Sequence, residues 1–208
     1  MNDLDVREVV LATRNAGKLR EMQAIVASVP ELAGVEVVSV ASFEGVDDVV
    51  ETGVTFEENA ALKAHAVAKA TGLPAIADDS GLAVDVLGGC PGVFSARWSG
   101  AHGADQANID LLLAQTGDVD AERLAAHFAC CVVLALPDGT QRVRFGELHG
   151  RLTRDQRGAG GFGYDPIFEL PDGRTLAELD AQEKNAISHR AKALQALRAD
   201  LAEVLTAS

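Results

Sequence analysis

Hydrophobic and polar positions along the chain follow two periodicities. Short apolar runs at residues 9–12, 35–40 and 74–77, and a longer run at 125–136, are typical of buried strands. Apolar residues recur at helical spacing over residues 19–29. A final amphipathic helix is indicated by the spacing of Ile187, Leu194, Leu197, Leu201 and Leu205. Because strands and helices are interleaved, the pattern predicts an α/β fold.

Turn and capping residues mark where further elements begin and end. Thr55 and Glu58 have the spacing of a capping box, which opens an alanine-rich helix that ends near Gly72. The turn at residues 137–140 predicts a hairpin, so part of the sheet is antiparallel. No repeat or linker interrupts the chain, and a single domain over residues 1–208 is predicted.

An acidic pair follows one of the predicted strands directly. The run 74–77 leads into Asp78 and Asp79, and residues 82–87 read as extended again, so the pair is predicted at a strand end. Open α/β sheets bind ligands at strand ends, and Glu51 offers a further carboxylate. Mg²⁺ takes one or two carboxylates and completes its shell with water and phosphate oxygens. The alternative is that these carboxylates only make the surface soluble.

The charge balance restricts the kinds of partner. The chain has 18 Lys and Arg against 31 Asp and Glu, a formal net charge of −13. Binding to a nucleic-acid polymer or to an anionic membrane needs a basic face, so neither is expected. A polyanionic small molecule remains possible where cations or a metal ion gather locally. The three cysteines suggest no disulfide framework, and no long apolar segment stands out, so a cytoplasmic protein is expected.

The segment from Thr13 to Lys18 is a candidate phosphate-binding loop. It lies between a predicted strand and a predicted helix, where backbone N–H groups and the helix dipole favour an anion. Gly17 lets the backbone come close, and Lys18 adds a positive charge. The spacing is not that of a Walker A loop. An ordinary turn with a solvated lysine is the alternative.

Two later segments could contact a ligand. Residues 158–163 match the dinucleotide fingerprint G-x-G-x-x-G, but Pro166 prevents a helix from following, which argues against a nicotinamide cofactor. Phe162 and Tyr164 in this loop suit stacking on a base, although a buried aromatic pair would explain them equally. Three potential cations lie close together further along the chain, at Lys184, His189 and Arg190. A polar helix face is the alternative for these.

Taken together, the motifs resemble a known family. The segments that carry the resemblance, in chain order, are Leu11–Lys18 (LATRNAGK), Glu51–Gly53 (ETG), Thr55–Ala60 (TFEENA), Ala77–Leu82 (ADDSGL), Gly161–Phe168 (GFGYDPIF) and Ser188–Arg190 (SHR). They resemble the Ham1/inosine triphosphatase family of noncanonical purine nucleoside triphosphate pyrophosphatases, over residues 9–194. Six motifs in one order are far more specific than any of them alone.

The resemblance implies a fold, a reaction and an assembly. The expected fold is an elongated α/β fold of two lobes around a mixed sheet, with the active-site cleft between the lobes, in a homodimer. The expected reaction is Mg²⁺-dependent hydrolysis of ITP, dITP or XTP to the monophosphate and pyrophosphate. Two rival interpretations are a nucleotide-binding sensor without turnover and a broader nucleotide pyrophosphatase.

The resemblance also implies a role for each matching residue. Glu51 and Asp79 would hold the metal, and Asp79 would also be the proton acceptor. The triphosphate would be bound by Thr13, Arg14, Asn15, Ala16, Gly17, Lys18 and Lys63. The rest of the substrate would be bound by Ser80, Phe162, Gly163, Tyr164, Asp165, Lys184, His189 and Arg190, with Phe162 stacked on the purine. Arg14 departs from the usual small or polar residue of its motif, and Val50 stands where some relatives have a second acid.

Overall fold

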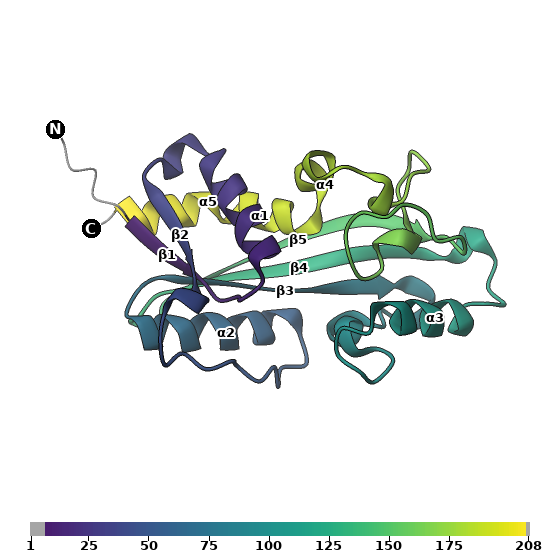
Figure 1. The fold of residues 1–208 in the computed structure, drawn as a ribbon, viewed down its shortest axis with the longest axis horizontal. Helices are drawn as coiled ribbons and strands as arrows, with labels where there is room; N and C mark the ends of the chain where they lie inside the picture. The colour runs from purple at the N-terminus through teal and green to yellow at the C-terminus, as the bar shows by residue number, and fades with distance from the viewer. Residues whose placement is uncertain (1–6, 207–208) are drawn as a thin grey trace. The chain divides into compact units, whose positions relative to one another are not determined.

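The strands form one mixed sheet in the part of the chain that the structure, a computed structural model, describes, residues 7–206. Its six strands lie in the order β2-β1-β3-β4-β5-β6 (Figure 1). Their bounds are β1 Arg7–Leu11, β2 Val35–Ser39, β3 Ala75–Val84, β4 Ala125–Ala135, β5 Gln141–Leu152 and β6 Phe168–Glu169. Strand β1 is parallel to β2 and to β3, whereas β6 is antiparallel to β5. The predicted α/β fold with a mixed sheet is therefore confirmed.

Five α-helices are described with these strands. They are α1 Ala16–Ala27, α2 Phe56–Thr71, α3 Asp105–Gln115, α4 Ala181–Ile187 and α5 His189–Thr206. The chain forms two compact units. The first unit contains the described residues up to 79, residues 130–146 and the described residues from 190 on; the second contains residues 80–129 and 147–189.

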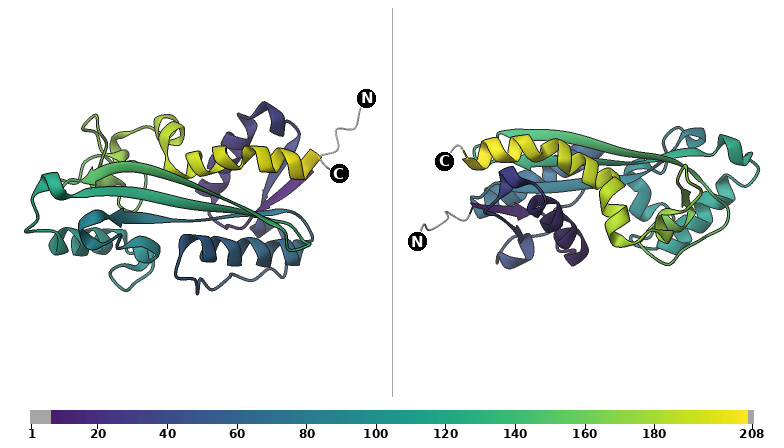
Figure 2. Two further views of the ribbon diagram at one scale, coloured as in Figure 1. Left: turned by 180° about the vertical axis from the view of Figure 1, so that it is seen from behind. Right: turned by 90° about the horizontal axis from the view of Figure 1, so that it is seen from above.

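In the first unit, helices cover both faces of the sheet, because successive side chains of a strand point to opposite faces. Helices α1 and α5 pack on the face that carries Leu11, Ile76 and Val132. Helix α2 packs on the opposite face, against Val10 and Ala77 (Figures 1 and 2). These strands are nearly continuous apolar runs because both faces are buried.

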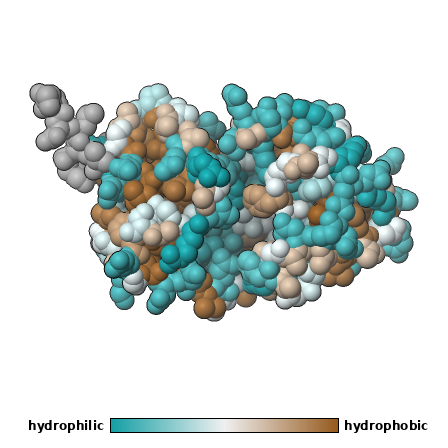
Figure 3. All heavy atoms as spheres, in the orientation of Figure 1, coloured by the Kyte–Doolittle hydropathy of each residue, from teal (hydrophilic) through white to brown (hydrophobic). Residues whose placement is uncertain are grey.

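The second unit has a separate core. Leu82 of β3, Leu112 of α3, Phe128 of β4 and Phe168 of β6 are among its buried members. The rings of Phe128 and Phe168 lie 4.8 Å apart between centroids, at a tilt of 51°. Hydrophilic side chains cover much of the molecular face in Figure 3, with hydrophobic patches between them. Over residues 7–206, no helix combines the length and the hydrophobicity needed to span a bilayer.

Several predicted turns and caps are confirmed. The backbone N–H of Leu136 donates to the carbonyl of Thr140 at 2.8 Å, which closes the hairpin between β4 and β5. Gly72 ends α2 in the left-handed conformation that glycine adopts at low cost. The capping box is only half formed: the Thr55 hydroxyl accepts from the N–H of Glu58, but the Glu58 carboxylate accepts from Val54 instead of Thr55.

Two predictions of element ends are wrong. Strand β3 runs without a break through Asp78, Asp79 and Gly81, so the acidic pair lies inside a ten-residue strand. The final helix is two helices, because Ser188 adopts extended backbone angles between α4 and α5. In both places the backbone conformation depends on packing against neighbouring elements, which the local pattern of side chains does not reveal.

Candidate active site

The carboxyl end of β1 is a point where the sheet topology reverses. Strand β1 lies between β2 and β3, and the helices that lead from β1 to β2 and from β2 to β3 lie on opposite faces of the sheet. Open α/β sheets bind their ligands at such switch points. Strand β1 ends at Leu11, opposite Ile76, while β3 continues to Val84. The acidic pair of β3 therefore lies just beyond the end of β1, beside the segment that starts at Thr13.

Asp78 and Asp79 point to opposite faces of β3 because they are consecutive in a strand. Asp78 lies on the face of α1 and α5, where Lys18 and Arg190 contact it. Asp79 lies on the face of α2, where Asn59 and Lys63 contact it. One strand thus supplies a carboxylate to each side of the sheet.

An acid cluster forms around Lys63 on the α2 side. The Lys63 ammonium donates to Glu51 Oε1 at 2.7 Å and lies 3.6 Å from Asp79 Oδ1. The Asn59 amide donates from Nδ2 to Asp79 Oδ2 at 3.1 Å. Glu51 comes from a loop, Lys63 from α2 and Asp79 from β3, so three separate segments converge here.

Asn59 and Gly53 fix the loop that carries Glu51. Asn59 is fully buried, and its Oδ1 accepts from the N–H of Gly53 at 2.8 Å. A Cβ on Gly53 would lie 2.6 Å from both Asn59 Oδ1 and Glu58 Cβ. Only glycine fits so close to Asn59. The side-chain amide of Asn59 thus binds both this loop and Asp79.

The acid cluster shifts the pKa values of its members. Burial raises the pKa of Asp79, and the neighbouring charges of Glu51 and Asp78 add to the rise, while Lys63 and Asn59 oppose it. Burial alone would lower the pKa of Lys63, but Asp79 and Glu51 outweigh it, and that pKa is raised. Asp79 is thus a carboxylate of increased basicity next to a fixed cation.

A second cluster occupies the α1 side. Lys18 Nζ and Arg190 Nε each donate to Asp78 Oδ2 at 3.0 Å, and another nitrogen of Arg190 donates to Glu21 at 2.7 Å. Burial would raise the pKa of Asp78, but Lys18 and Arg190 outweigh it and hold the pKa well below its usual range. The pKa of Arg190 is raised above its usual value: burial opposes the rise, and Asp78 and Glu21 cause it.

The segment from Thr13 to Lys18 is shaped by its own side chains. Asn15 caps α1, and its Oδ1 accepts from the N–H groups of Gly17 and Lys18 at 2.8 and 3.3 Å. Thr13 in turn accepts from the N–H of Asn15. Arg14 donates to Asp48 and to the carbonyl of Val46, which accounts for this departure from the motif. Ala16 begins α1.

The glycine-rich loop of the second unit presents an aromatic ring. Phe162 is 61% exposed, and Lys184 Nζ lies 4.9 Å from the centroid of its ring. The buried carboxylate of Asp165 accepts from the N–H of Phe162 at 2.8 Å and forms an ion pair with Lys184. A Cβ on Gly161 would collide with Asp165, and the φ of Gly161 is +74°. Asp165 and Lys184 therefore hold this loop in one conformation.

The remaining predicted residues of this unit are mostly buried. Tyr164 donates to the carbonyl of Ser95 at 3.0 Å, and burial raises its pKa. The ring of His189 is stacked on Phe128 at 4.9 Å between centroids. The N–H of Gly163 donates to Asp105 at 2.9 Å. Ser80 follows Asp79 in β3 and is half-buried.

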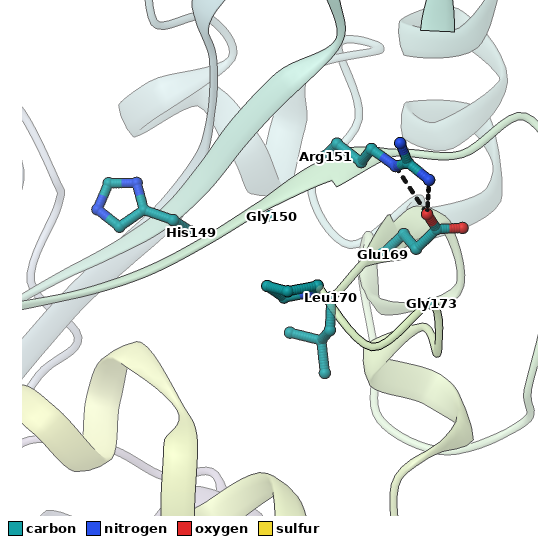
Figure 4. A pocket seen from close by; sticks show the side chains of 7 residues that line it. His149, Gly150, Arg151, Glu169, Leu170 and Gly173 are labelled. Carbon is teal, nitrogen blue, oxygen red and sulfur yellow. Dashed lines mark hydrogen bonds and ion pairs between the residues drawn. The ribbon is translucent and has the colours of Figure 1, made fainter. Parts of the chain in front are cut away.

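Two surface pockets are lined by other residues. One, of about 450 Å³, is lined by Thr52, Gly53, Glu58, Ala61, Leu62 and His65. The other, of about 400 Å³, is lined by His149, Gly150, Arg151, Glu169, Leu170, Pro171 and Gly173. In the second pocket Arg151 donates to Glu169 (Figure 4), which also forms an ion pair with Arg157. Neither lining contains a residue that the sequence motifs assign to substrate or metal.

Two residues that hold the clusters together, Asn59 and Glu21, were not predicted from the sequence. Asn59 lies inside one of the matching motifs but was given no role. Glu21 follows Lys18 by three positions on α1, a spacing that places two side chains on one helix face and could have revealed it. The opposite orientations of Asp78 and Asp79 would have followed from treating residues 75–84 as one strand.

Comparison with known proteins agrees with the motifs. The Ham1 family matches residues 9–200. A Streptomyces coelicolor protein named dITP/XTP pyrophosphatase is 60% identical over 201 residues, which cover 95% of this chain and 98% of that protein. A protein of the same name from Escherichia coli O157:H7 is 51% identical, covering 92% of this chain and 96% of its own length.

Solved structures give the same result. The structure of a HAM1 protein from Coxiella burnetii has a TM-score of 0.84 at 42% identity and covers 97% of this chain and all of that chain (100%). The structure of a nucleoside-triphosphatase and dITP/XTP pyrophosphatase from Mycobacterium abscessus has a TM-score of 0.76 at 48% identity, over 91% of this chain and 97% of that chain. The similarity spans nearly the whole of each chain and includes the site motifs, and the chain therefore belongs to the Ham1 family.

Proposed function

We propose that this protein hydrolyses the noncanonical purine nucleoside triphosphates ITP, dITP and XTP to the monophosphate and pyrophosphate. The observation that carries the proposal is the convergence of Glu51, Lys63 and Asp79 on one side of β3, just beyond the end of β1. Lys18 contacts the neighbouring Asp78 on the other side of the strand. Relatives that are 60% and 51% identical are named dITP/XTP pyrophosphatases. The enzyme would keep such nucleotides out of the pool used for nucleic-acid synthesis.

The phosphates bind to the first unit in this proposal. Lys18 and Lys63 supply positive charge, and the segment from Thr13 to Gly17 supplies backbone N–H groups and the positive end of α1. The N–H groups of Gly17 and Lys18 donate to Asn15 Oδ1, so a phosphate oxygen would replace the Asn15 side chain there. The exchange satisfies the same donors with a charged acceptor.

The donor set fits Mg²⁺. Glu51 and Asp79 direct carboxylate oxygens toward one ammonium, and hard oxygen donors in this number suit a magnesium ion that also binds phosphate. The charged side chains of the two clusters are Lys18, Lys63, Arg190, Glu21, Glu51, Asp78 and Asp79. Carboxylates outnumber cations among them, so a divalent cation is needed before a triphosphate is attracted. Bound Mg²⁺ would neutralise charge on the phosphoryl oxygens.

Asp79 is the proton acceptor in this proposal. The oxygen of a water molecule forms a bond to the α-phosphorus, and the bond from that phosphorus to the bridging oxygen breaks, which releases pyrophosphate. Asp79 accepts the proton that the water loses. Its raised pKa makes it a stronger base than an exposed aspartate, and Asn59 holds its carboxylate in one orientation.

The base binds to the glycine-rich loop that contains Phe162 in this proposal. The exposed ring of Phe162 offers a stacking surface, and Lys184 and backbone N–H groups of its loop can donate to the 6-oxo group of hypoxanthine or xanthine. Adenine has an amino donor at that position, so ATP would leave buried donors unpaired, at a cost of about 1–3 kcal/mol each. Arg190, which the resemblance also assigns to substrate binding, donates to Asp78 and Glu21.

A substrate panel tests the proposal. Pyrophosphate release is measured with Mg²⁺ and ITP, XTP, dITP, ATP, GTP or dTTP, and the expected result is a much higher kcat/KM for the first three. Binding of ITP without product would identify a sensor. Equal kcat/KM values across the panel would identify a broader pyrophosphatase and would refute selection for the 6-oxo group.

We also propose that the enzyme is cytoplasmic and homodimeric. The free thiols of Cys130 and Cys131 are buried, as expected for a protein of a reducing compartment, and the proposed substrates belong to the cytoplasmic nucleotide pool. The homodimer is an expectation from the family. Light scattering of the purified protein tests it, and a monomeric mass would contradict it.

A further inference from the structure

Asp78 is a buried carboxylate that the reaction does not use directly. Its side chain is 4% exposed, and its Oδ2 accepts from both Lys18 and Arg190 at 3.0 Å. Lys18 belongs to the first turn of α1, and Arg190 to the first turn of α5. A single oxygen atom thus joins two helices to β3 through charged hydrogen bonds, which are stronger than neutral ones.

The geometry separates Asp78 from the metal-binding carboxylates. It points to the α1 side of β3, whereas Asp79 points to the α2 side with Glu51 and Lys63. Adjacent side chains in a strand cannot both reach a point on one face. Asp78 therefore has a function other than binding the metal, and its contacts with Lys18 and Arg190 indicate that function.

We infer that Asp78 is a positioning residue that holds the Lys18 ammonium at the carboxyl end of β1, where the triphosphate binds. The inference rests on the proposed function. A lysine side chain has four rotatable bonds, and freezing them on binding costs free energy that a preformed ion pair has already paid. An ammonium carries three donors, so its bond to Asp78 leaves it able to donate to phosphate oxygens.

The rest of the cluster supports Asp78 from the other side. Arg190 is 6% exposed and donates to Asp78 and to Glu21, so a chain of ion pairs runs from Glu21 through Arg190 and Asp78 to Lys18. The Arg190 guanidinium donates to Asp78 Oδ2 and so holds the Asp78 carboxylate in place. Lys18 is the more exposed of the two cations: 25% of its side chain is exposed, so a ligand can reach it.

A double-mutant cycle tests the inference. Steady-state kinetics with dITP and Mg²⁺ are compared for the wild type, Asp78→Asn, Lys18→Ala and the double variant. We expect Asp78→Asn to raise KM about tenfold or more while kcat changes by less than about threefold, because uniform substrate binding is lost. The double variant should resemble Lys18→Ala within about twofold, because Asp78 acts through Lys18.

A matched control separates positioning from folding. Asp200 is also a buried aspartate with two arginine partners, Arg144 at 2.8 Å and Arg142 at 3.8 Å, and it lies outside both clusters. Asp200→Asn should lower the Tm and leave KM unchanged. If Asp78→Asn does not fold, Asp78→Glu takes its place in the cycle, because it keeps the charge but moves the carboxylate by one methylene.

Each result has a distinct meaning. A wild type that releases no pyrophosphate refutes the proposed function, and the inference with it. An active wild type with additive effects of the two substitutions, or with an unchanged KM in the Asp78 variant, overturns the inference and leaves the proposed function in place. A raised KM in Asp200→Asn equal to that in the Asp78 variant also overturns it, since the effect would then be a general loss of stability.

Discussion

At the scale of single residues, two consecutive aspartates have opposite environments. Asp78 is held by two cations, and its pKa is lowered well below its usual range although burial opposes this. Asp79 has a raised pKa, because burial is less completely offset by Lys63 and Asn59. The alternation of a β-strand is enough to separate the two roles. A carboxylate that anchors cations and the proposed proton acceptor can therefore be neighbours in sequence.

Replacing Asp79 should abolish turnover without unfolding the protein. Asp79→Asn keeps the shape of the side chain and removes its negative charge, so we expect kcat to fall by about 100-fold or more. Pyrophosphate release measures the loss, and the Tm checks folding. Asp110→Asn, at an exposed aspartate of α3, is the control and should retain full activity. An Asp79→Asn enzyme with near wild-type kcat would exclude Asp79 as the proton acceptor.

Asn59 should set the acid limb of the pH profile. Its Nδ2 donates to the charged form of Asp79 and so lowers the pKa of that carboxylate, against the rise that burial causes. Removing the donor in Asn59→Ala raises the pKa further. The proposed role of Asp79 requires its deprotonated form, so the fall of kcat/KM on acidification should begin at a higher pH than in the wild type. An unchanged acid limb would show that Asn59 does not tune Asp79.

At the scale of secondary-structure elements, local signals predicted much of the fold and missed the site's geometry. Strand β4 and helix α1 were predicted because local apolar patterns are enough to indicate them. Strand β3 was divided in two because Asp78 to Gly81 is polar and contains glycine, a pattern usually found in loops. These residues stay extended because β3 pairs with neighbours on the sheet, which is information from distant parts of the chain.

The same limit explains the other misses. The family resemblance made Lys18, Lys63 and Asp79 candidates, but an ion pair such as that of Arg190 with Asp78 joins positions 112 residues apart. No local pattern can reveal such a contact. The break between α4 and α5 at Ser188 likewise has no Pro or Gly to mark it.

The start of α2 offers a test at this scale. Thr55 caps the helix that carries Asn59 and Lys63, through one hydrogen bond to the N–H of Glu58 at 3.1 Å. Thr55→Ala should lower the free energy of unfolding by about 1 kcal/mol, because a helix N–H loses its acceptor. Urea denaturation measures the change. Thr55→Ser keeps the hydroxyl and should restore most of the stability; an equal loss in both variants would mean that the methyl group matters instead of the cap.

At the scale of the whole molecule, an acidic protein has to bind a polyanion. The net charge of −13 opposes the approach of a triphosphate, and the two clusters beside the end of β1 contain more carboxylates than cations. Screening by salt weakens the general repulsion. Only a cation bound at the acid cluster can reverse the local sign of charge. Magnesium should therefore act on this protein in two separable ways, as a general electrolyte and as a bound ion.

Thermal unfolding separates these two effects. Mg²⁺ that binds the folded state at Glu51 and Asp79 stabilises it by about 2.7 kcal/mol at a hundred times its dissociation constant, whereas NaCl at equal ionic strength only screens charge. The Tm should thus rise more with MgCl₂ than with NaCl. Glu51→Gln keeps the side chain's size and loses its charge, so this excess should disappear while the NaCl effect remains. An excess that persists in Glu51→Gln would place the magnesium ion elsewhere, because the acid cluster would no longer account for it.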